Sequence, residues 1–243
     1  MEGRGIRTIE LPDPIRACLF DLDGVLTDTA RVHAAAWKEM FDGFLREHSA
    51  TAGEPLRPFD LEHDYGDYVD GLPRYAGVQS FLASRGIDLP AETMQRLGDR
   101  KDEIFLRILR ERVVEPYPGS VHFVNAAREA GLHTAVVSSS VHTAEVLEAA
   151  GIDALFETRV DGNVLQQEHL KGKPAPDSYL AAARRLGVGH EQAAVFEDAL
   201  AGVEAGRAGR FGYVVGVDRS GHAQALREHG ADIVVEDLSE LIA

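Results

Sequence analysis

Five short apolar runs, each about as long as a β-strand, constrain the fold of this chain more than any other feature. They are residues 17–20, 134–137, 193–196, 211–217 and 233–235. Their short length and polar flanks are typical of strands that are buried on both faces. Stretches with helical spacing lie between them, such as Tyr179–Leu186. Strands that alternate with helices predict an α/β fold, with a Rossmann-like parallel sheet core and helices on both faces.

One long stretch interrupts this alternation, because residues 29–117 carry helical patterns but no convincing strand. Apolar residues with the spacing of an amphipathic helix occur at Trp37, Met40, Phe41, Phe44 and Leu45. A second pattern, at 104–109, is followed by Pro116 and Pro118, which we expect to stop the helix. The polar segment 49–61 is expected to be a loop.

These patterns predict two domains. A small α-helical cap domain, residues 31–117, is inserted after the first strand. The α/β core domain then consists of residues 1–30 and 118–243.

Polar residues follow most of the predicted strands. They are Asp21, Ser138, the pair Glu197-Asp198, and Asp218. In open α/β sheets the ligand crevice lies at the carboxyl ends of the strands. We therefore expect these side chains to converge on one site.

The most informative of these strand ends holds two aspartates. Asp21 and Asp23 stand two residues apart, so their carboxylates can lie close together and repel each other. A hard cation with oxygen ligands, Mg²⁺, relieves that repulsion. Gly24 permits the tight turn that follows. An ordinary Asp-Gly turn is the alternative, but the buried strand before it and Thr27-Asp28 after it favour a functional site.

Two further segments carry groups suited to phosphate. Ser138 offers a hydroxyl and backbone amides beside the start of a helix, although Ser139 or Ser140 could simply cap that helix. Lys173 precedes Pro174-Ala-Pro, which we expect to be extended and to aim the ammonium group, unless this is an ordinary exposed lysine.

Glu197 and Asp198 place two more carboxylates after an apolar strand, at the start of a helix. Compensation of the helix dipole, worth about 0.3–1 kcal/mol, is the alternative explanation for such acids. Several such features at the strand ends of one sheet favour a shared site.

Four segments, taken in order, resemble the four motifs of the haloacid dehalogenase superfamily of phosphotransferases. They are DLDGVLTD (21–28), VVSSS (136–140), KGKPAPD (171–177) and VFEDALAG (195–202). The helical insert resembles the small α-helical cap of that superfamily. Within the insert, residues 27–41 and GLPR (71–74) are similar to the beta-phosphoglucomutase-like branch.

The resemblance implies roles for the core residues. Asp21 would be the nucleophile that becomes an aspartyl phosphate, and Asp23 the general acid and base. Ser138 and Lys173 would hold the transferring phosphoryl group. For Mg²⁺ the resemblance implies Asp21, Asp23 through its carbonyl oxygen, Asp198, and Glu197 as a further ligand or a support.

The resemblance also implies substrate-binding residues. They are His33, Trp37, Gly71, Arg74 and Lys101 in the cap, with Ser139 and Ser140 in the core. His33 would couple cap closure to acid–base action, Arg74 would bind the distal phosphate, and Lys101 would contact sugar hydroxyls. A packed histidine and two solvated surface charges are the alternatives.

The chain departs from the branch at one point. After the Ser-x-Ser of the second motif, its mutases have Lys and Asn, which help to bind the distal phosphate. Here Val141 and His142 take those places.

The implied activity is Mg²⁺-dependent phosphoryl transfer that interconverts β-glucose 1-phosphate and glucose 6-phosphate through a bisphosphate. A sugar-phosphate phosphatase, in which water attacks the phospho-aspartate, is the alternative. A phosphate-binding or partner-binding module without catalysis is disfavoured by the retained motif residues. The chain contains no G-x-x-x-x-G-K-[ST] and no G-x-G-x-x-G, so a P-loop kinase and a dinucleotide enzyme are unsupported.

Composition excludes other classes. Asp and Glu number 40 against 25 Lys and Arg, a net charge of −15 at pH 7 that would repel nucleic acid and anionic lipid. Cys18 is the only cysteine, which excludes an intramolecular disulfide and a Cys-rich zinc site. No apolar run reaches the roughly 18 residues that a membrane span needs. We expect a cytoplasmic monomer that binds a small-molecule sugar phosphate, and neither nucleic acid nor membranes.

Overall fold

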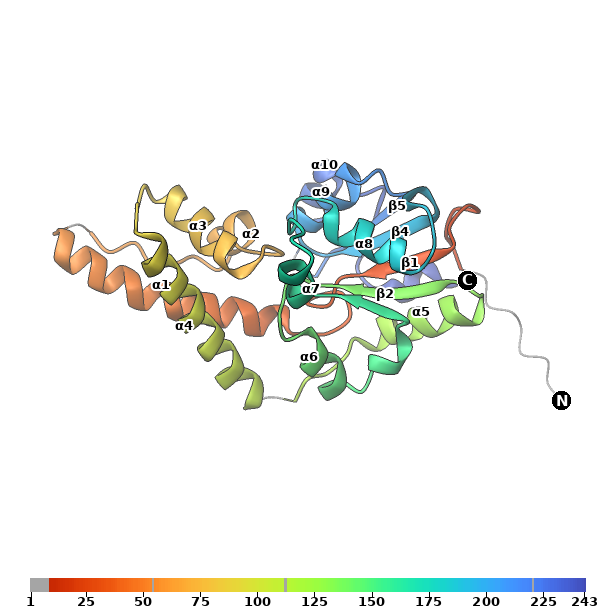
Figure 1. The fold of residues 1–243 in the computed structure, drawn as a ribbon, viewed down its shortest axis with the longest axis horizontal. Helices are drawn as coiled ribbons and strands as arrows, with labels where there is room; N and C mark the ends of the chain where they lie inside the picture. Colours follow the sequence, from red (N-terminus) through yellow and green to blue (C-terminus); the bar gives the residue numbers. More distant parts are fainter. Residues whose placement is uncertain (1–8, 54, 112, 220) are drawn as a thin grey trace.

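The computed structural model describes residues 9–53, 55–111, 113–219 and 221–243. A six-stranded sheet, with all strand pairs parallel and the order β3-β2-β1-β4-β5-β6, forms its core (Figure 1). The strands are β1 Ala17–Phe20, β2 His133–Val137, β3 Thr158–Val160, β4 Ala193–Glu197, β5 Tyr213–Val217 and β6 Ile233–Val235. The predicted Rossmann-like parallel sheet is confirmed.

Two differences from the predicted strands have local causes. Strand β3 escapes the sequence pattern, because Thr158-Arg159-Val160 is too short and too polar to form an apolar run. Strand β5 begins at Tyr213, two residues after the predicted start, because the Gly212 N–H turns to bond the carbonyls of His190 and Ala193.

Helices cover both faces of the sheet, as predicted. They are α5 Pro118–Glu129, α6 Thr143–Ala149, α7 Gly162–Gln167, α8 Asp177–Arg185, α9 Leu200–Ala208 and α10 Ala223–His229, with short 3-10 turns η1 Asp153–Leu155, η2 His190–Gln192 and η3 Leu238–Leu241. Side chains of β1 alternate between two hydrophobic clusters, as the two-residue period of a strand requires. Cys18 and Phe20 face α5 and α6, while Ala17 and Leu19 face α8 and α9.

Four helices form a separate body at one end of the sheet (Figure 1). They are α1 Ala30–Ala52, α2 Asp64–Tyr68, α3 Arg74–Ser84 and α4 Ala91–Arg110, inserted between β1 and α5. Their hydrophobic cluster is drawn from residues 32–109 alone. The helical insertion after β1 is thereby confirmed. The domain boundaries themselves stay a prediction, and residues 1–8 of the predicted core domain lie outside the described residues.

The predicted helix boundaries in the insert need two corrections. Helix α1 continues through Ala52, into the segment expected to be a loop, because residues 49–52 contain neither glycine nor proline. Gly53 ends it with a left-handed φ of 69°, and its N–H bonds to the Ser49 carbonyl. Pro118 starts α5 instead of stopping α4, since a proline in the first turn of a helix loses no intrahelical hydrogen bond.

The two connections between insert and core lie side by side. The Asp28 N–H donates to the Glu115 carbonyl at 3.3 Å, and the Tyr117 N–H to the Leu26 carbonyl at 2.9 Å. The Tyr117 hydroxyl also donates to Asp28 at 3.0 Å, and the guanidinium of Arg219 stacks 3.8 Å from the Tyr117 ring. The insert is therefore joined to the core through two linkers that are hydrogen-bonded to each other.

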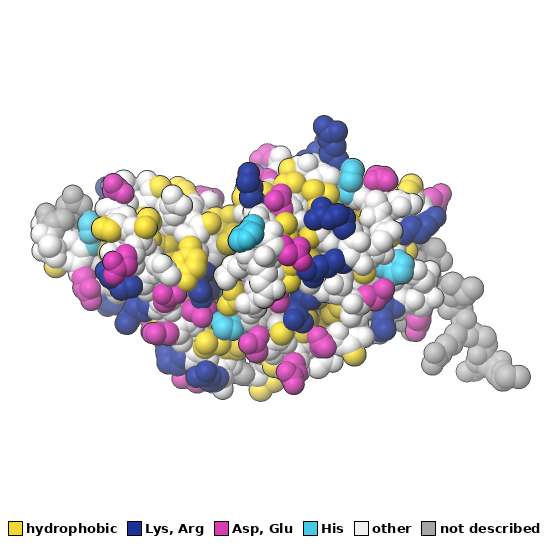
Figure 2. Space-filling model, in the orientation of Figure 1, with side chains coloured by type: hydrophobic (Ala, Val, Ile, Leu, Met, Phe, Trp, Pro, Cys, Tyr) yellow, Lys and Arg dark blue, Asp and Glu magenta, His cyan; other side chains and the backbone are white. Residues whose placement is uncertain are grey.

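No helix in the described part of the chain is both long and apolar enough to cross a membrane. Figure 2 shows acidic and basic side chains interspersed over the visible face of the core and of the insert.

Replacing Phe196 with alanine should test the centre of the core. Phe196 is fully buried, stacks on Phe20 at 4.6 Å between ring centroids, and lies 5.2 Å from the ring of Phe123. We expect Phe196→Ala to lower the free energy of unfolding by about 3–5 kcal/mol in urea titrations. Val113→Ala, at an 84% exposed position, should change it by less than about 0.5 kcal/mol. Equal effects of the two substitutions would contradict the packing described here.

Candidate active site

Polar residues that follow three adjacent strands meet at the carboxyl edge of the sheet. Asp21 follows β1, Ser138 follows β2 and Asp198 follows β4. The Asp21 N–H donates to the Phe196 carbonyl and the Ser138 N–H to the Val160 carbonyl, both at 3.0 Å. These two hydrogen bonds continue the pattern of the sheet and hold both residues in place. The strand order reverses at this point, which is where α/β folds bind ligands.

Lys173 lies beneath this edge as a buried cation. Its side chain is 1% exposed, forms an ion pair with Asp21, and places Nζ 2.5 Å from Glu197 Oε1. Burial opposes the charge, but the two carboxylates hold the pKa of Lys173 above its usual range. The predicted extended segment at this lysine is wrong, because the Ala175 N–H bonds back to the Gly172 carbonyl at 3.0 Å and closes a turn.

Three acids form a cluster that suits a divalent cation. Ligand oxygens of Asp21, Glu197 and Asp198 lie within 4.8 Å of one another. Burial, and then the neighbouring carboxylates, raise the pKa of Asp198 well above its ordinary value. Burial likewise raises the pKa of Asp21, although Lys173 opposes the shift. These carboxylates are crowded and resist ionisation, and they offer only oxygen atoms as metal ligands. Both properties fit a hard cation.

Glu197 contributes to this cluster mainly as a support. It is fully buried, accepts a hydrogen bond from the Tyr179 hydroxyl at 2.8 Å, and accepts another from the Ala199 N–H at 3.2 Å. With Lys173 also paired to it, most of its acceptor capacity is used by the protein.

Asp23 stands at the end of a chain of polar groups from the insert. Thr29 donates a hydrogen bond to its Oδ1, and His33 Nε2 lies 3.4 Å from the same oxygen. Lys101 Nζ lies 2.7 Å from His33 Nδ1, where it can donate and leave the histidine proton on the nitrogen facing Asp23. Burial opposes ionisation of Asp23, yet His33, Thr29 and Lys101 together lower its pKa.

Lys101 and Trp37 form the adjoining wall. Lys101 is 4% exposed, and Nζ lies 5.1 Å from the centre of the Trp37 ring. Burial lowers the pKa of Lys101 to about 7, against the attraction of Asp23 and Asp102. The alternative of a solvated surface charge is therefore wrong for this lysine. His33 stacks on Phe105 at 4.1 Å, so it is packed as well as placed beside Asp23.

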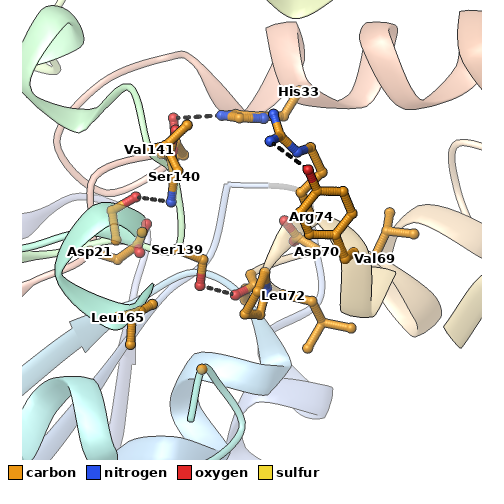
Figure 3. A pocket seen from close by; sticks show the side chains of 18 of the residues that line it. Asp21, His33, Val69, Asp70, Leu72, Arg74, Ser139, Ser140, Val141 and Leu165 are labelled. Carbon is orange, nitrogen blue, oxygen red and sulfur yellow. Dashed lines mark hydrogen bonds and ion pairs between the residues drawn. The ribbon is translucent and has the colours of Figure 1, made fainter. Parts of the chain in front are cut away.

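The insert and the core enclose a cavity of about 470 Å³. Ser139 Oγ donates to the Gly71 carbonyl at 2.8 Å and points toward the insert loop beside Leu72 (Figure 3). Gly71 has a φ of 68°, and a β-carbon there would lie 3.0 Å from the Ala199 methyl. Only glycine suits this close approach. Figure 3 shows Asp21 and Ser139 on one side of the pocket, with Asp70 and Arg74 on the other.

The predicted site residues converge on this cavity. All of them line it except Lys173, Glu197 and Asp218. Lys173 and Glu197 lie behind Asp21 and support it. The prediction that Asp218 joins the site is wrong, because its carboxylate instead accepts the backbone N–H groups of His222 and Ala223 at the start of α10. Neither Ser139 nor Ser140 is the helix cap, because the N-cap residue of α6 is His142. The Ser140 hydroxyl instead accepts the His142 N–H at 3.2 Å.

Sequence reasoning missed several polar residues of the site. Thr29 and Tyr179 lie on helical patterns that signal packing only. Asp70 and Asp102 adjoin the predicted Gly71 and Lys101, but no spacing rule selects them. Burial raises the pKa of Asp70 to about 6, and the charges of Glu197 and Asp23 act in the same direction.

Comparisons with known proteins place this site in a family context. Residues 15–210 match the sequence model of the haloacid dehalogenase-like hydrolases. Beta-phosphoglucomutase of Mycobacterium tuberculosis is 52% identical over 97% of this chain and 95% of its own length. Beta-phosphoglucomutase of Bacillus subtilis is 32% identical over 93% and 92%. A hydrolase structure from Pseudomonas syringae superimposes with a TM-score of 0.76 and 25% identity, covering 93% of this chain and 95% of the other.

Gly24→Ala should weaken cation binding. Gly24 has a φ of 92°, and an added β-carbon would overlap the carboxylate of Asp198. We expect the affinity for MgCl₂, measured by titration calorimetry, to fall at least about tenfold. Gly131→Ala is the matched control, because Gly131 has a φ of 81° and no atom within 4 Å of the added carbon. Equal affinities in the two variants would show that Asp198 does not hold the cation.

Proposed function

The chain belongs to the haloacid dehalogenase-like hydrolase family, and we propose that this phosphotransferase interconverts β-glucose 1-phosphate and glucose 6-phosphate with Mg²⁺ as its cofactor. The observation that carries the proposal is the near-complete match to a mycobacterial beta-phosphoglucomutase, combined with a cavity whose two walls come from core and insert. We extend the haloacid dehalogenase interpretation of the four motifs to the residues that the structure brings together there.

Asp21 is the proposed nucleophile. An oxygen of its carboxylate attacks the phosphorus of the phosphate donor, and the bond from that phosphorus to the sugar oxygen breaks. Lys173 lies against Asp21 and can stabilise negative charge on the transferring oxygens, as can the hydroxyl of Ser138. Asp21, Asp198 and the carbonyl of Asp23 would hold Mg²⁺, whose charge would neutralise the phosphoryl oxygens.

Asp23 is the proposed general acid and base. It protonates the departing sugar oxygen, and in the second half-reaction it takes the proton of the attacking hydroxyl. Thr29 and His33 orient its carboxylate. Because His33 and Lys101 belong to the insert, docking of the insert also sets the environment of this acid–base group.

Arg74 is the proposed ligand of the second phosphate. It lines the cavity from α3 on the insert, opposite the Asp21 edge. A mutase must hold a bisphosphate at both ends and keep water from the phospho-aspartate, so a cation on the closing wall is what the reaction needs. Trp37, Gly71, Ser139 and Ser140 shape the remaining wall.

A sugar-phosphate phosphatase is the second candidate. Val141, a neutral side chain, lines the cavity where the resemblance implies a lysine in the mutases, so the second phosphate has fewer cationic contacts. Water would then discharge the phospho-aspartate. A cytoplasmic location and a monomeric state stay predictions.

Asp23→Asn tests the acid–base assignment. It should slow formation and discharge of the aspartyl phosphate by about a hundred- to ten-thousand-fold, measured by rapid quench, because a proton donor is lost. Mg²⁺ affinity should change little, since the backbone carbonyl is retained. Asp21→Asn should form no phospho-enzyme at all, whereas Asp67→Asn, at an exposed acid of α2, should behave as wild type. Equal loss of metal affinity and rate in Asp23→Asn would mean that Asp23 is mainly a ligand.

Arg74→Ala separates the mutase from the phosphatase. We expect it to lower the ratio of glucose 6-phosphate formed to phosphate released by about tenfold or more, in a coupled assay, because attack of water needs no second phosphate contact. Arg96→Ala, at a 64% exposed arginine of α4, is the control. An unchanged ratio in Arg74→Ala would remove the support that the insert gives to the mutase.

A further inference from the structure

Two nitrogens of residues in the cavity wall have no hydrogen-bond partner. Among the side chains that the structure describes, the buried polar atoms without a hydrogen bond are His33 Nε2, Arg74 Nε and Ser178 Oγ. Two of these residues line the cavity. A buried donor without an acceptor is costly, and a bound ligand or ion is one explanation for such a group in a native structure. His33 Nε2 lies 3.4 Å from Asp23 Oδ1, so Arg74 Nε is the nitrogen that a ligand oxygen would satisfy.

The other nitrogens of Arg74 are already engaged. Nη1 forms an ion pair with Asp102, and Nη2 donates to the Tyr75 hydroxyl at 3.3 Å. These contacts fix the plane of the guanidinium, which leaves the Nε edge as the free one. An arginine fixed in this way loses less rotamer freedom when it binds an anion.

Asp102 is itself held from the other domain. His142 Nε2 lies 3.1 and 3.2 Å from its two carboxylate oxygens. His142 is the N-cap residue of α6 in the core, while Asp102 and Arg74 lie on α4 and α3 of the insert. The ring of His142 also stacks on Phe105 of α4, with 5.8 Å between centroids. A continuous chain of contacts therefore runs from the core to the arginine.

His142 takes no direct part in the wall. The residues that line the cavity include Asp102 and Val141 but not His142. Its side chain is joined to the wall by the contact with Asp102. Burial opposes ionisation of Asp102, yet hydrogen bonds from His142 and Arg74 hold its pKa at about 2. Asp102 thus remains an anion that contacts both Arg74 and His142.

We propose that His142 and Asp102 are positioning residues that aim Arg74 at the second phosphate of the substrate, so that this phosphate contact forms only when the insert is docked on the core. The proposal rests on the proposed function, which supplies a substrate with two phosphates. Specificity for such a substrate then depends on a core residue that never touches it.

A double-mutant cycle tests the proposed chain of contacts from His142 through Asp102 to Arg74. The measured quantity is the ratio of kcat/KM for phosphoryl transfer from glucose 1,6-bisphosphate to that from acetyl phosphate, which has no second phosphate. Arg74→Ala should lower this ratio about a hundredfold, and His142→Ala about tenfold, mainly through KM. In the Arg74→Ala background, His142→Ala should lower it no further. His142→Gln, which keeps a donor for Asp102, should restore most of the wild-type ratio.

The matched control is His229→Ala. It breaks another histidine–acid pair, His229 of α10 with Glu204 of α9 at 2.6 Å, neither of which lines the cavity, and should leave the ratio unchanged. An equal loss from His142→Ala with and without Arg74 would overturn the proposal, because His142 would then act independently. A higher ratio in Asp102→Asn would also overturn it, since Asp102 would then compete with the phosphate for Arg74.

A second readout needs no turnover. In ¹⁵N-labelled protein, the Nε–H signal of Arg74, identified by its absence in Arg74→Ala, should be protected from solvent exchange. We expect that protection to be lost in His142→Ala and in Asp102→Asn. Unchanged protection in both would overturn the positioning roles. If the protection behaves as expected while the wild type shows no preference for the bisphosphate, the proposed function fails and the positioning of Arg74 stands.

Discussion

A buried ammonium group, that of Lys173, holds together carboxylates that would otherwise repel one another. It pairs with Asp21 and Glu197 at an edge of the sheet where a third acid, Asp198, also lies. Buried charges of this kind are tolerated only when they are paired and hydrogen-bonded. The parallel sheet supplies the geometry, because β1 and β4 end side by side. The rest of the site is built upon this neutralised cluster.

The helical insert adds the groups that the sheet edge lacks. His33 and Lys101 reach Asp23, and Arg74 supplies a cation on the opposite wall. Ser139 and Gly71 join the insert to the core beside them. The proposed acid–base action and the proposed recognition of the second phosphate would therefore both depend on the contact between insert and core. That coupling suits a reaction that must exclude water while a bisphosphate reorients.

How much could be predicted from the sequence depends on whether a feature is local. The apolar run before Asp21 and the polar residues after it lie within a few positions of each other, so the sequence predicts both the strand and its site residues. Strand β3 could not be predicted in this way, because Thr158-Arg159-Val160 forms a strand only through its pairing with β2. The contact between Asp102 and His142 joins residues 40 positions apart, one on the insert and one on the core. Only the docked structure reveals it.

The proposed function depends on Asp21 passing a phosphoryl group between two positions of one sugar. The most direct measurement is ³¹P NMR of the purified protein with Mg²⁺, β-glucose 1-phosphate and a small amount of glucose 1,6-bisphosphate. We expect the 1-phosphate signal to be converted into that of glucose 6-phosphate, with little inorganic phosphate. Loss of the 1-phosphate signal with matching growth of inorganic phosphate would contradict it and identify a phosphatase.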